Sequence, residues 1–523
     1  MFETRQKMNR RCFLHIANKV VCGSWLSGLT ASAARGLDAH RQTLPNIIYI
    51  LVDDLGYGDV NLELKQSGFF NNPHIQTPNL AKLARESLVF RHHYASSPVC
   101  SPSRAGLLTG RTPTRCNINQ YINDKTENEK FFLHDREITI PELLKRKGYE
   151  TAIFGKWHLN GADWEKREAW RGWTGSFPQQ QGFDHGIVCK EDPHFTRRLN
   201  VNTQKHPGDY FTVKGEPVGA IKGYSSDILS DRAIDWLKRK RNASKPFFIY
   251  MSYDAVHIRV AAADRYEALY DTGDARKDAY YANITHVDAA IGRLLEGIKR
   301  LGLADGTIVF FSSDNGPDVL RCWDATYFCY GTSYPLRGQK YQLYEGGIRV
   351  PGMVRWPGKI RPGISDEPNA TLDVLPTLCD LVNARLPEDR QIDGASLLDH
   401  LLSGKPVQRE KPLYWQYEYP REYETAGEGY ERRLNGQKTL SQKLRPHVAI
   451  RRGHYVLLGY HEKRFEWPVV FKLFNVVADP EQREDLSSRE PQRFAAMKEE
   501  CATMYRKVNR DRLKTQAMIK ERT

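Results

Sequence analysis

Four short apolar segments of this chain are each followed at once by polar side chains. Their length and composition are typical of buried parallel strands, and they are NIIYILV (46–52), YETAIF (149–154), PFFIYMSY (246–253) and TIVFFSS (307–313). Stretches typical of amphipathic helices lie between them, at 141–148, 225–240 and about 277–301. This alternation predicts a large, doubly wound, mixed α/β sheet flanked by helices.

The polar side chains after these strands would meet at one edge, because ligands in such sheets bind beyond the carboxyl ends of the strands. They are Asp53, Asp54, Lys156, His158, His257, Asp314 and Asn315. Three carboxylates and an amide oxygen are hard ligands that suit Ca²⁺ or Mg²⁺ better than zinc. Each motif alone also occurs in ordinary turns and helix caps, so it is their convergence that predicts a site.

Two further features suit an anionic substrate. Lys156 and His158 are two positions apart, so an extended segment would project a cation and a proton carrier to one face. A surface salt bridge is the alternative, and His257 alone fits a structural role as well as a functional one. Lys340 lies among glycines in LRGQKYQLYEGGIRVP, and glycine lets the backbone approach a ligand closely.

A lone cysteine, Cys100, stands where a helix is predicted to begin in SSPVCSPSRAGLLTGR. A helix N-terminus offers free N–H groups and a partial positive charge, which suit anions and lower a thiol pKa. Cys100 is therefore either a small buried residue that precedes a helix or a nucleophile, or its precursor, that faces an anion. The local sequence leaves both interpretations open.

The first 33 residues have the features of an export signal. Arg10 and Arg11 precede a mildly apolar stretch, and the Ala-Ser-Ala at 31–33 fits a cleavage site. A frayed basic tail is the alternative. We therefore expect an exported protein, periplasmic or extracellular. No apolar run of the sequence is long enough to span a bilayer.

The chain has 523 residues, which is too many for one small core. We expect a catalytic α/β domain at 44–405 and a smaller C-terminal domain at 406–523. Segments within 412–460 predict a small antiparallel sheet that is followed by a helix. The basic end of that helix (506–522) is expected to be a solvated face.

The formal net charge of +14 predicts attraction to a polyanion, either nucleic acid or a sulfated or carboxylated polysaccharide. The nine cysteines form no C-x-x-C pair and no zinc spacing. Cys322 and Cys329 are close enough in sequence to form a disulfide in an oxidising compartment.

The motif CSPSRAGLLTGR is similar to the Cys-x-Pro-Ser-Arg signature of the type I, formylglycine-dependent sulfatases of the alkaline phosphatase superfamily. The similarity continues in the family's order through NIIYILVDDLGYGDV, GKWHL, SSDNGP, LRGQKYQLYEGGIRVP and LDVLPTLCDL. It covers roughly residues 44 to 490. An ordered series of motifs is far more specific than any one of them, and the branch it most resembles contains arylsulfatase A and N-acetylgalactosamine-6-sulfatase.

The resemblance implies a role for each matching residue. A separate formylglycine-generating enzyme would oxidise Cys100 to formylglycine, whose hydrated aldehyde supplies an oxygen nucleophile in place of a thiol. Arg104 would orient and stabilise the oxyanion that attacks sulfur, which gives a covalently sulfated enzyme. One Ca²⁺ would favour the ionised diol, and its ligands would be the modified Cys100, Asp53, Asp54, Asp314 and Asn315.

The remaining roles concern the sulfate and the protons. Lys156 and Lys340 would hold the sulfate oxygens where charge develops. His257, with Lys340, would donate a proton to the leaving alcohol, and His158 would take the proton from the second hydroxyl as sulfate is expelled. The chain departs from the family at 256–259, where Val-His-Ile-Arg replaces Pro-His-x-Pro. Arg259 would add a cation near the leaving group, or bind a second anionic group of the substrate.

The sequence thus predicts an exported sulfatase that removes sulfate from a sulfated carbohydrate. Its partner is expected to be a sulfated glycan, not nucleic acid, and segments 160–225 and 412–465 are expected to determine its specificity. A phosphonate or phosphodiester hydrolase of the same superfamily is one alternative. An inactive glycan-binding relative is another.

Overall fold

The computed structural model describes residues 44–64, 71–122, 132–160, 176–189, 210–218, 221–258, 260–319, 329–418, 445–460 and 467–520. From Pro45 onward these residues belong to one compact unit. The predicted export signal, Arg259, Cys322 and most of the two predicted specificity segments lie outside the described residues. The predictions made for them, and the predicted domain boundary, stay predictions.

The main sheet is built outward from β1 (Asn46–Val52), six of whose seven residues are buried. Because both faces of β1 are apolar, it takes a central position with parallel partners on either side, β7 (Phe247–Tyr253) and β8 (Thr307–Ser313). Parallel strands β4 (Glu150–Lys156) and β5 (His185–Cys189) follow beyond β7.

Shorter strands complete the nine-stranded sheet, whose order is β10-β2-β9-β8-β1-β7-β4-β5-β6. β9 runs antiparallel to β8 and to β2, and β6 runs antiparallel to β5, so the sheet is mixed as predicted. The bounds of these strands are β2 Leu88–Phe90, β6 Phe211–Thr212, β9 Gly352–Arg355 and β10 Gly363–Ser365. A separate two-stranded ladder pairs β3 (His93–Tyr94) with β11 (Asn369–Ala370).

The predicted strands at 46–52 and 307–313 have the bounds seen in the structure, whereas β4 runs two residues past its predicted end and includes Lys156. Gly155 explains this extension. Its φ is 114°, and a Cβ placed there would lie 1.9 Å from the Ser252 carbonyl oxygen of β7. Only glycine allows β4 and β7 to stay this close up to the edge of the sheet.

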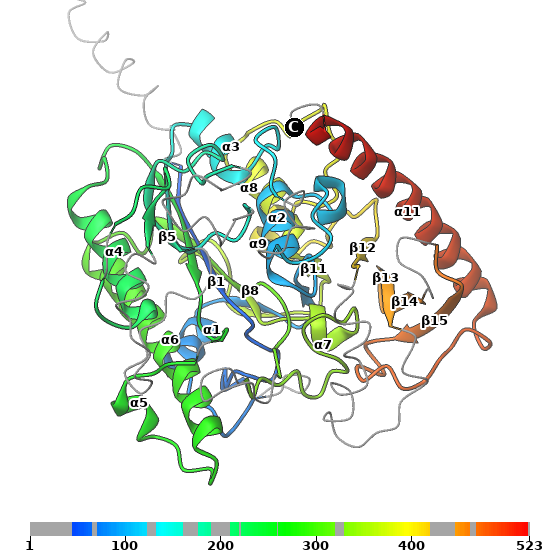
Figure 1. Cartoon of the computed structure of the whole chain (residues 1–523), viewed down its shortest axis with the longest axis horizontal. Coiled ribbons are helices and arrows are strands. Elements are labelled where there is room, and N and C mark those ends of the chain that lie inside the picture. The colour runs from blue at the N-terminus through cyan, green and yellow to red at the C-terminus, as the bar shows by residue number, and fades with distance from the viewer. Residues whose placement is uncertain are drawn as a thin grey trace, which may run out of the picture. The chain divides into compact units, whose positions relative to one another are not determined.

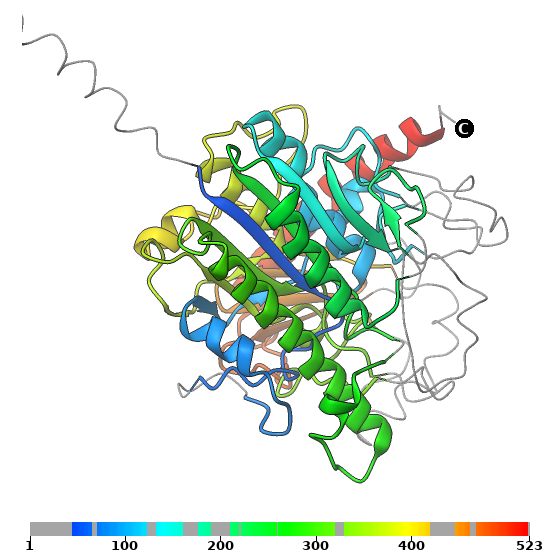
Figure 2. The ribbon, with the colours of Figure 1, turned by 90° about the vertical axis from the view of Figure 1, so that its left-hand side faces the viewer.

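Helices cover both faces of the sheet. α4 (Ser225–Arg239), α6 (Ala275–Arg300) and α1 (Pro78–Arg85) lie on one side, where they share an apolar core with β1, β7 and β4. Figure 2 shows the long helices α4 and α6 in green across this face. α2 (Cys100–Thr109), α3 (Ile140–Arg146) and α8 (Val374–Leu381) lie on the other side (Figure 1). The predicted doubly wound fold is confirmed.

The C-terminal part forms the predicted antiparallel sheet, in the order β12-β13-β14-β15. Its strands are Leu413–Gln416, Pro446–Arg452, Tyr455–Tyr460 and Val470–Asn475. α11 (Pro491–Lys520) packs one apolar face, with Met497, Cys501 and Met504, against this sheet (Figure 1). Arg506 and Arg510 on the same helix are exposed, as predicted. No helix among the described residues has the length and apolar character needed to span a membrane.

The C-terminal sheet is bonded to the segment that leads into α2. Trp415 of β12 is 1% exposed, and its indole Nε1 donates a hydrogen bond to the Ala95 carbonyl oxygen at 2.8 Å. Arg451 of β13 donates a hydrogen bond to the Tyr94 hydroxyl. The C-terminal sheet and the β3–β11 ladder contribute to one apolar cluster that includes Val99, the residue before Cys100. The smaller sheet therefore fixes the approach to α2.

Replacing this indole tests how much the contact contributes to stability. Trp415→Phe keeps an aromatic ring but leaves the buried Ala95 carbonyl without its donor. We expect the free energy of unfolding to fall by about 2 kcal/mol, measured by chemical denaturation. Trp236→Phe is the matched control and should cost less, because Trp236 is 3% exposed and its Nε1 has no hydrogen-bond partner among the described residues. Equal losses in the two variants would show that the Trp415 hydrogen bond contributes nothing specific.

Candidate active site

The end of β1 places two aspartates in the interior of the protein. Asp53 and Asp54 are 0% and 1% exposed. The backbone of Asp54 is left-handed (φ 60°), and its N–H donates to Oδ1 of Asp314 at 3.1 Å. Because β1 and β8 are parallel neighbours with Val52 paired to Ser313, the residues that follow the two strands lie at the same level. The predicted convergence of Asp53, Asp54 and Asp314 is confirmed.

Asn315 completes this group of oxygen ligands. Its side-chain Nδ2 donates to Asp54 Oδ1 at 2.7 Å and to the Gly316 carbonyl at 2.8 Å. Its Oδ1 is buried and accepts no hydrogen bond within the described part of the chain. A Cβ at Gly316 would lie 2.0 Å from the Gly346 carbonyl oxygen, so glycine is needed where this turn meets the loop that carries Lys340.

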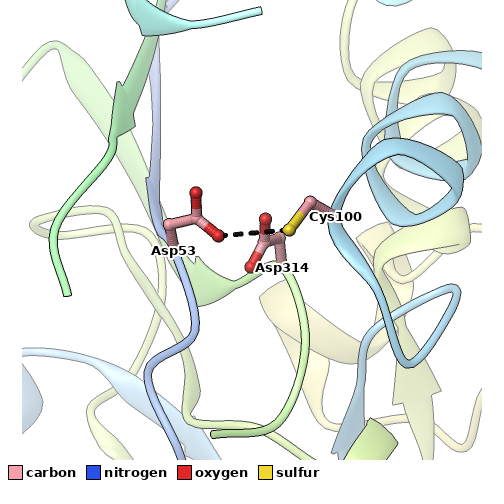
Figure 3. Close-up of side chains that lie close together, drawn as sticks. All are labelled: Asp53, Cys100 and Asp314. Atoms are coloured by element: carbon pink, nitrogen blue, oxygen red, sulfur yellow. Dashed lines mark hydrogen bonds between the residues drawn. The ribbon is translucent and has the colours of Figure 1, made fainter. Parts of the chain in front are cut away.

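Cys100 is the first residue of α2 and points at the two strand ends (Figure 3). Its Sγ lies 3.4 Å from Asp53 Oδ1. Asp53, Cys100 and Asp314 each offer a ligand atom, and these three atoms lie within 4.8 Å of one another. The cysteine is therefore not a residue that merely precedes a helix. It offers one candidate ligand atom to a buried candidate metal centre.

Arg104, one turn further along α2, bonds the helix to the carboxyl ends of β8, β4 and β7. Its Nε and Nη2 both donate to one oxygen, Asp314 Oδ2, at 3.1 and 2.8 Å, and hydrogen bonds between charged groups are stronger than neutral ones. Nη1 donates to the Lys156 carbonyl at 3.1 Å and to the Ser252 hydroxyl. The guanidinium is fully buried, so α2 cannot rotate or shift without breaking several charge-assisted bonds.

Two lysines pair with the aspartates of β1. Lys156 Nζ lies 2.6 Å from Asp53 Oδ2, and Lys340 Nζ lies 2.6 Å from Asp54 Oδ2. Lys156 is 0% exposed and Lys340 is 2% exposed. Together with Arg104, they place three cations from three separate segments against the carboxylates.

The two histidines occupy different surroundings. His257 Nε2 lies 3.8 Å from Asp54 Oδ2, and its side chain is 14% exposed. His158 has a left-handed backbone (φ 51°), and its Nε2 is 2.8 Å from the Ile122 carbonyl oxygen. The expectation that Lys156 and His158 share one face required an extended segment through both residues, and this premise is wrong because β4 ends at Lys156 and His158 is left-handed.

Burial and charge set the protonation of these groups. Burial, assisted by the Asp53 carboxylate, raises the pKa of the Cys100 thiol well above its usual range. This direction is opposite to the lowering expected from the helix N-terminus. Burial also raises the pKa of Asp53, but Lys156, His257 and Arg104 outweigh it and hold that pKa well below normal. For Asp314, burial and the adjacent Asp53 raise the pKa to about 7, which reflects how closely the carboxylates are crowded.

The site contains two polar residues that the sequence analysis missed. Ser252 Oγ donates to the Lys156 carbonyl at 2.7 Å and accepts from Arg104. Asp318 Oδ2 lies 3.7 Å from Lys340 Nζ. Ser252 falls inside a predicted strand, one residue before its end, and Asp318 follows the Asp-Asn-Gly turn by two residues. Attention to the residues that flank each strand end would have found both.

A buried cysteine at a helix start, facing carboxylates and cations at the carboxyl edge of a doubly wound sheet, defines a hydrolase site for anionic esters. Residues 45–384 match the Sulfatase family model, and the chain therefore belongs to the sulfatase family and is a sulfuric ester hydrolase. Residues 338–431 match a second model, N-sulphoglucosamine sulphohydrolase, C-terminal. The resemblance found in the sequence is confirmed.

Individual relatives place the chain within this family. It is 32% identical to human N-acetylgalactosamine-6-sulfatase over 71% of its own length and 68% of that protein. It is 33% identical to human arylsulfatase A over 75% and 74% of the two chains. The crystal structure of Ps i-CgsB in complex with k-i-k-neocarrahexaose superimposes with a TM-score of 0.71 at 25% identity, covering 88% of this chain and 93% of the other.

The raised thiol pKa generates a test on protein in which Cys100 is still a cysteine. In the folded protein at pH 8, iodoacetamide should alkylate Cys100 at least about a hundredfold more slowly than in the urea-unfolded chain, because thiolate and access are both lacking. Peptide mass spectrometry measures the rate at each cysteine. Buried Cys116 reports any general unfolding. Rapid alkylation of Cys100 while Cys116 stays protected would contradict the assigned pKa direction.

Proposed function

We propose that this enzyme removes sulfate from a sulfated carbohydrate, with a nucleophile made by converting Cys100 to formylglycine and with one bound Ca²⁺. The observation that carries the proposal is the position of Cys100. It is buried at the start of α2, 3.4 Å from Asp53, and surrounded by Lys156, Lys340 and Arg104. A separate formylglycine-generating enzyme is the partner required for maturation.

The residues present fit a calcium ion. Asp53, Asp54, Asp314 and the amide oxygen of Asn315 are hard oxygen donors of the kind Ca²⁺ prefers. Among the described residues, the buried Asn315 Oδ1 has no hydrogen-bond partner, so it has an acceptor site left for a cation. When bound, the ion supplies Lewis-acid charge that neutralises sulfate and favours an ionised oxygen nucleophile.

The raised pKa of the Cys100 thiol supports an oxygen nucleophile. A buried thiol facing Asp53 is a poor source of thiolate. Formylglycine, when present, supplies the hydroxyls of a hydrated aldehyde at the same position. Arg104 lies one helical turn after Cys100, and its bonds to Asp314 and Ser252 fix its position. It would orient the attacking oxygen and offset its negative charge.

The surrounding cations and histidines would handle the sulfate and the protons. Lys156 and Lys340 would hold sulfate oxygens, since the charge they present is preorganised by buried aspartates. His257 Nε2, 3.8 Å from Asp54, would give a proton to the leaving alcohol. His158, held at the Ile122 carbonyl, would take the proton from the second hydroxyl as sulfate leaves. Arg259 would bind a second anionic group of the substrate.

Three observations support a carbohydrate as the leaving group. The formal charge of +14 favours a polyanion. One relative is named for an N-acetylgalactosamine 6-sulfate ester, and Ps i-CgsB has been crystallised with a neocarrahexaose. The segment at 1–33 is proposed to direct export, which would bring the enzyme to glycans outside the cytoplasm.

A substrate panel tests the proposal. It contains N-acetylgalactosamine 6-sulfate, k-i-k-neocarrahexaose, 4-nitrophenyl sulfate, methyl sulfate, 4-nitrophenyl phosphate and the phosphodiester bis(4-nitrophenyl) phosphate. On protein made with an active formylglycine-generating enzyme, we expect an aldehyde or its hydrate at position 100 by peptide mass spectrometry. Sulfate release from a sugar should exceed phosphate release, and Cys100→Ala should lower kcat/KM at least about a thousandfold.

The controls separate the alternatives. Cys116→Ala removes a buried cysteine outside the site and should leave the chemistry unchanged. Faster hydrolysis of bis(4-nitrophenyl) phosphate than of any sulfate ester would favour the phosphonate or phosphodiester hydrolase. An intact thiol at position 100, with a control sulfatase converted in the same cells, would contradict the catalytic assignment and favour an inactive glycan-binding protein.

Calcium binding can be measured without turnover. In metal-free protein, Ca²⁺ at a hundred times its Kd should raise the free energy of unfolding by about 2.7 kcal/mol, and the melting temperature should rise with it. Asn315→Ala removes one ligand and should weaken Ca²⁺ binding in calorimetry, whereas Asn242→Ala, at an exposed asparagine, should not. Equal Kd values for the three proteins would mean that Ca²⁺ binds elsewhere.

A further inference from the structure

Two half-buried tyrosines, Tyr121 and Tyr341, lie beside the residues assigned to sulfate. Their ring centroids are 6.2 Å apart, and the rings meet edge to face at 72°. Lys340 Nζ lies 5.6 Å from the centroid of the Tyr341 ring. We propose that this tyrosine pair binds the sugar ring that carries the sulfate. The inference rests on the function proposed above and adds the surface that recognises the sugar.

The position of Tyr341 is fixed by its neighbour Lys340 and by the segment that leads into Cys100. It directly follows Lys340, and its backbone N–H donates to the Pro98 carbonyl at 2.9 Å, two residues before Cys100. Its φ of 70° lies in the left-handed region, where a residue with so large a side chain is rare. Backbone conformations of this kind concentrate at ligand sites, where the surrounding contacts maintain them. The position of this ring is thus set by the segments that carry Lys340 and Cys100.

Tyr121 is fixed in the same way through its neighbour. The N–H of Ile122 donates to the Ser101 hydroxyl at 3.0 Å, and its carbonyl oxygen bonds to His158 Nε2 at 2.8 Å. Tyr121 is therefore adjacent to a residue that touches both the start of α2 and a histidine of the site. Both tyrosines pack against the apolar cluster that contains Val99, yet both keep part of their surface exposed.

The chemistry of a pyranose matches such a surface. Its C–H groups form apolar patches that pack on aromatic faces, while its hydroxyls stay free to form hydrogen bonds. Tyrosine gives a large, rigid, amphipathic contact at a low cost in side-chain entropy. Small-molecule sites commonly combine such aromatic surface with a few fixed charges. Here the charges at Lys156 and Lys340 would hold the sulfate, and the tyrosine pair would hold the ring.

Single substitutions and two substrates test this assignment. The variants are Tyr121→Leu and Tyr341→Leu, each with its Phe counterpart, and the substrates are methyl sulfate and the panel sugar with the highest kcat/KM. Removing either aromatic ring should lower kcat/KM for the sugar about three- to tenfold, mainly through KM. It should leave methyl sulfate unaffected, since that ester has no ring to bind. The Phe variants should retain most of the sugar activity.

Tyr344→Leu is the matched control, because Tyr344 is a half-buried tyrosine of the same loop that packs on the same apolar cluster. It should leave the ratio of sugar to methyl sulfate activity unchanged. Equal losses for both substrates in the Tyr121 and Tyr341 variants would overturn the assignment, since they indicate general damage. So would hydrolysis of methyl or 4-nitrophenyl sulfate by the wild-type enzyme without any sugar activity. If the wild type hydrolyses no sulfate ester, the proposed function itself fails, and the sugar site fails with it.

Discussion

Three buried ion pairs at the ends of β1 and β8 hold the candidate active site together. Each carboxylate is matched by a cation from a different segment: α2 contributes Arg104, β4 contributes Lys156, and the glycine-rich loop contributes Lys340. Removing an ion from water costs several kcal/mol, which is recovered only when its partner is well placed. The three segments are therefore held in one relative arrangement, and removing either member of a pair leaves a buried charge without its nearest counter-charge.

The segment that follows the C-terminal sheet also fixes the loop that carries Lys340. Gln482, which follows β15, is 1% exposed, and its Oε1 accepts from the Glu345 N–H at 2.9 Å. Its own carbonyl accepts from Arg337 Nη1 at 3.0 Å. These two bonds fall on either side of Lys340 in the sequence. Gln482 thus links the segment that follows the small sheet to both sides of the loop that carries Lys340.

Much of this arrangement could be predicted from the sequence. Continuous apolar runs mark β1 and β8 to the residue, and the carboxyl-edge rule brings Asp53, Asp54, Asp314 and Asn315 together without any structure. The rule fails where the backbone leaves the extended region, as at His158, because two-residue periodicity holds only within a strand. The Tyr121–Tyr341 contact could not be predicted in this way. It depends on how far side chains from distant segments reach once the sheet has closed, and no local pattern carries that information.

The hydrogen bond from Trp415 to Ala95 joins residues that are 320 positions apart. At a typical synthesis rate, the ribosome needs about 15 to 60 seconds to add that much chain. During that interval the segment around Cys100 is already made, while β12, the rest of the small sheet and α11 do not yet exist. In the finished protein Cys100 is only 2% exposed. Until β12 is made, the segment that leads into Cys100 therefore lacks the hydrogen bond that fixes it in the folded protein.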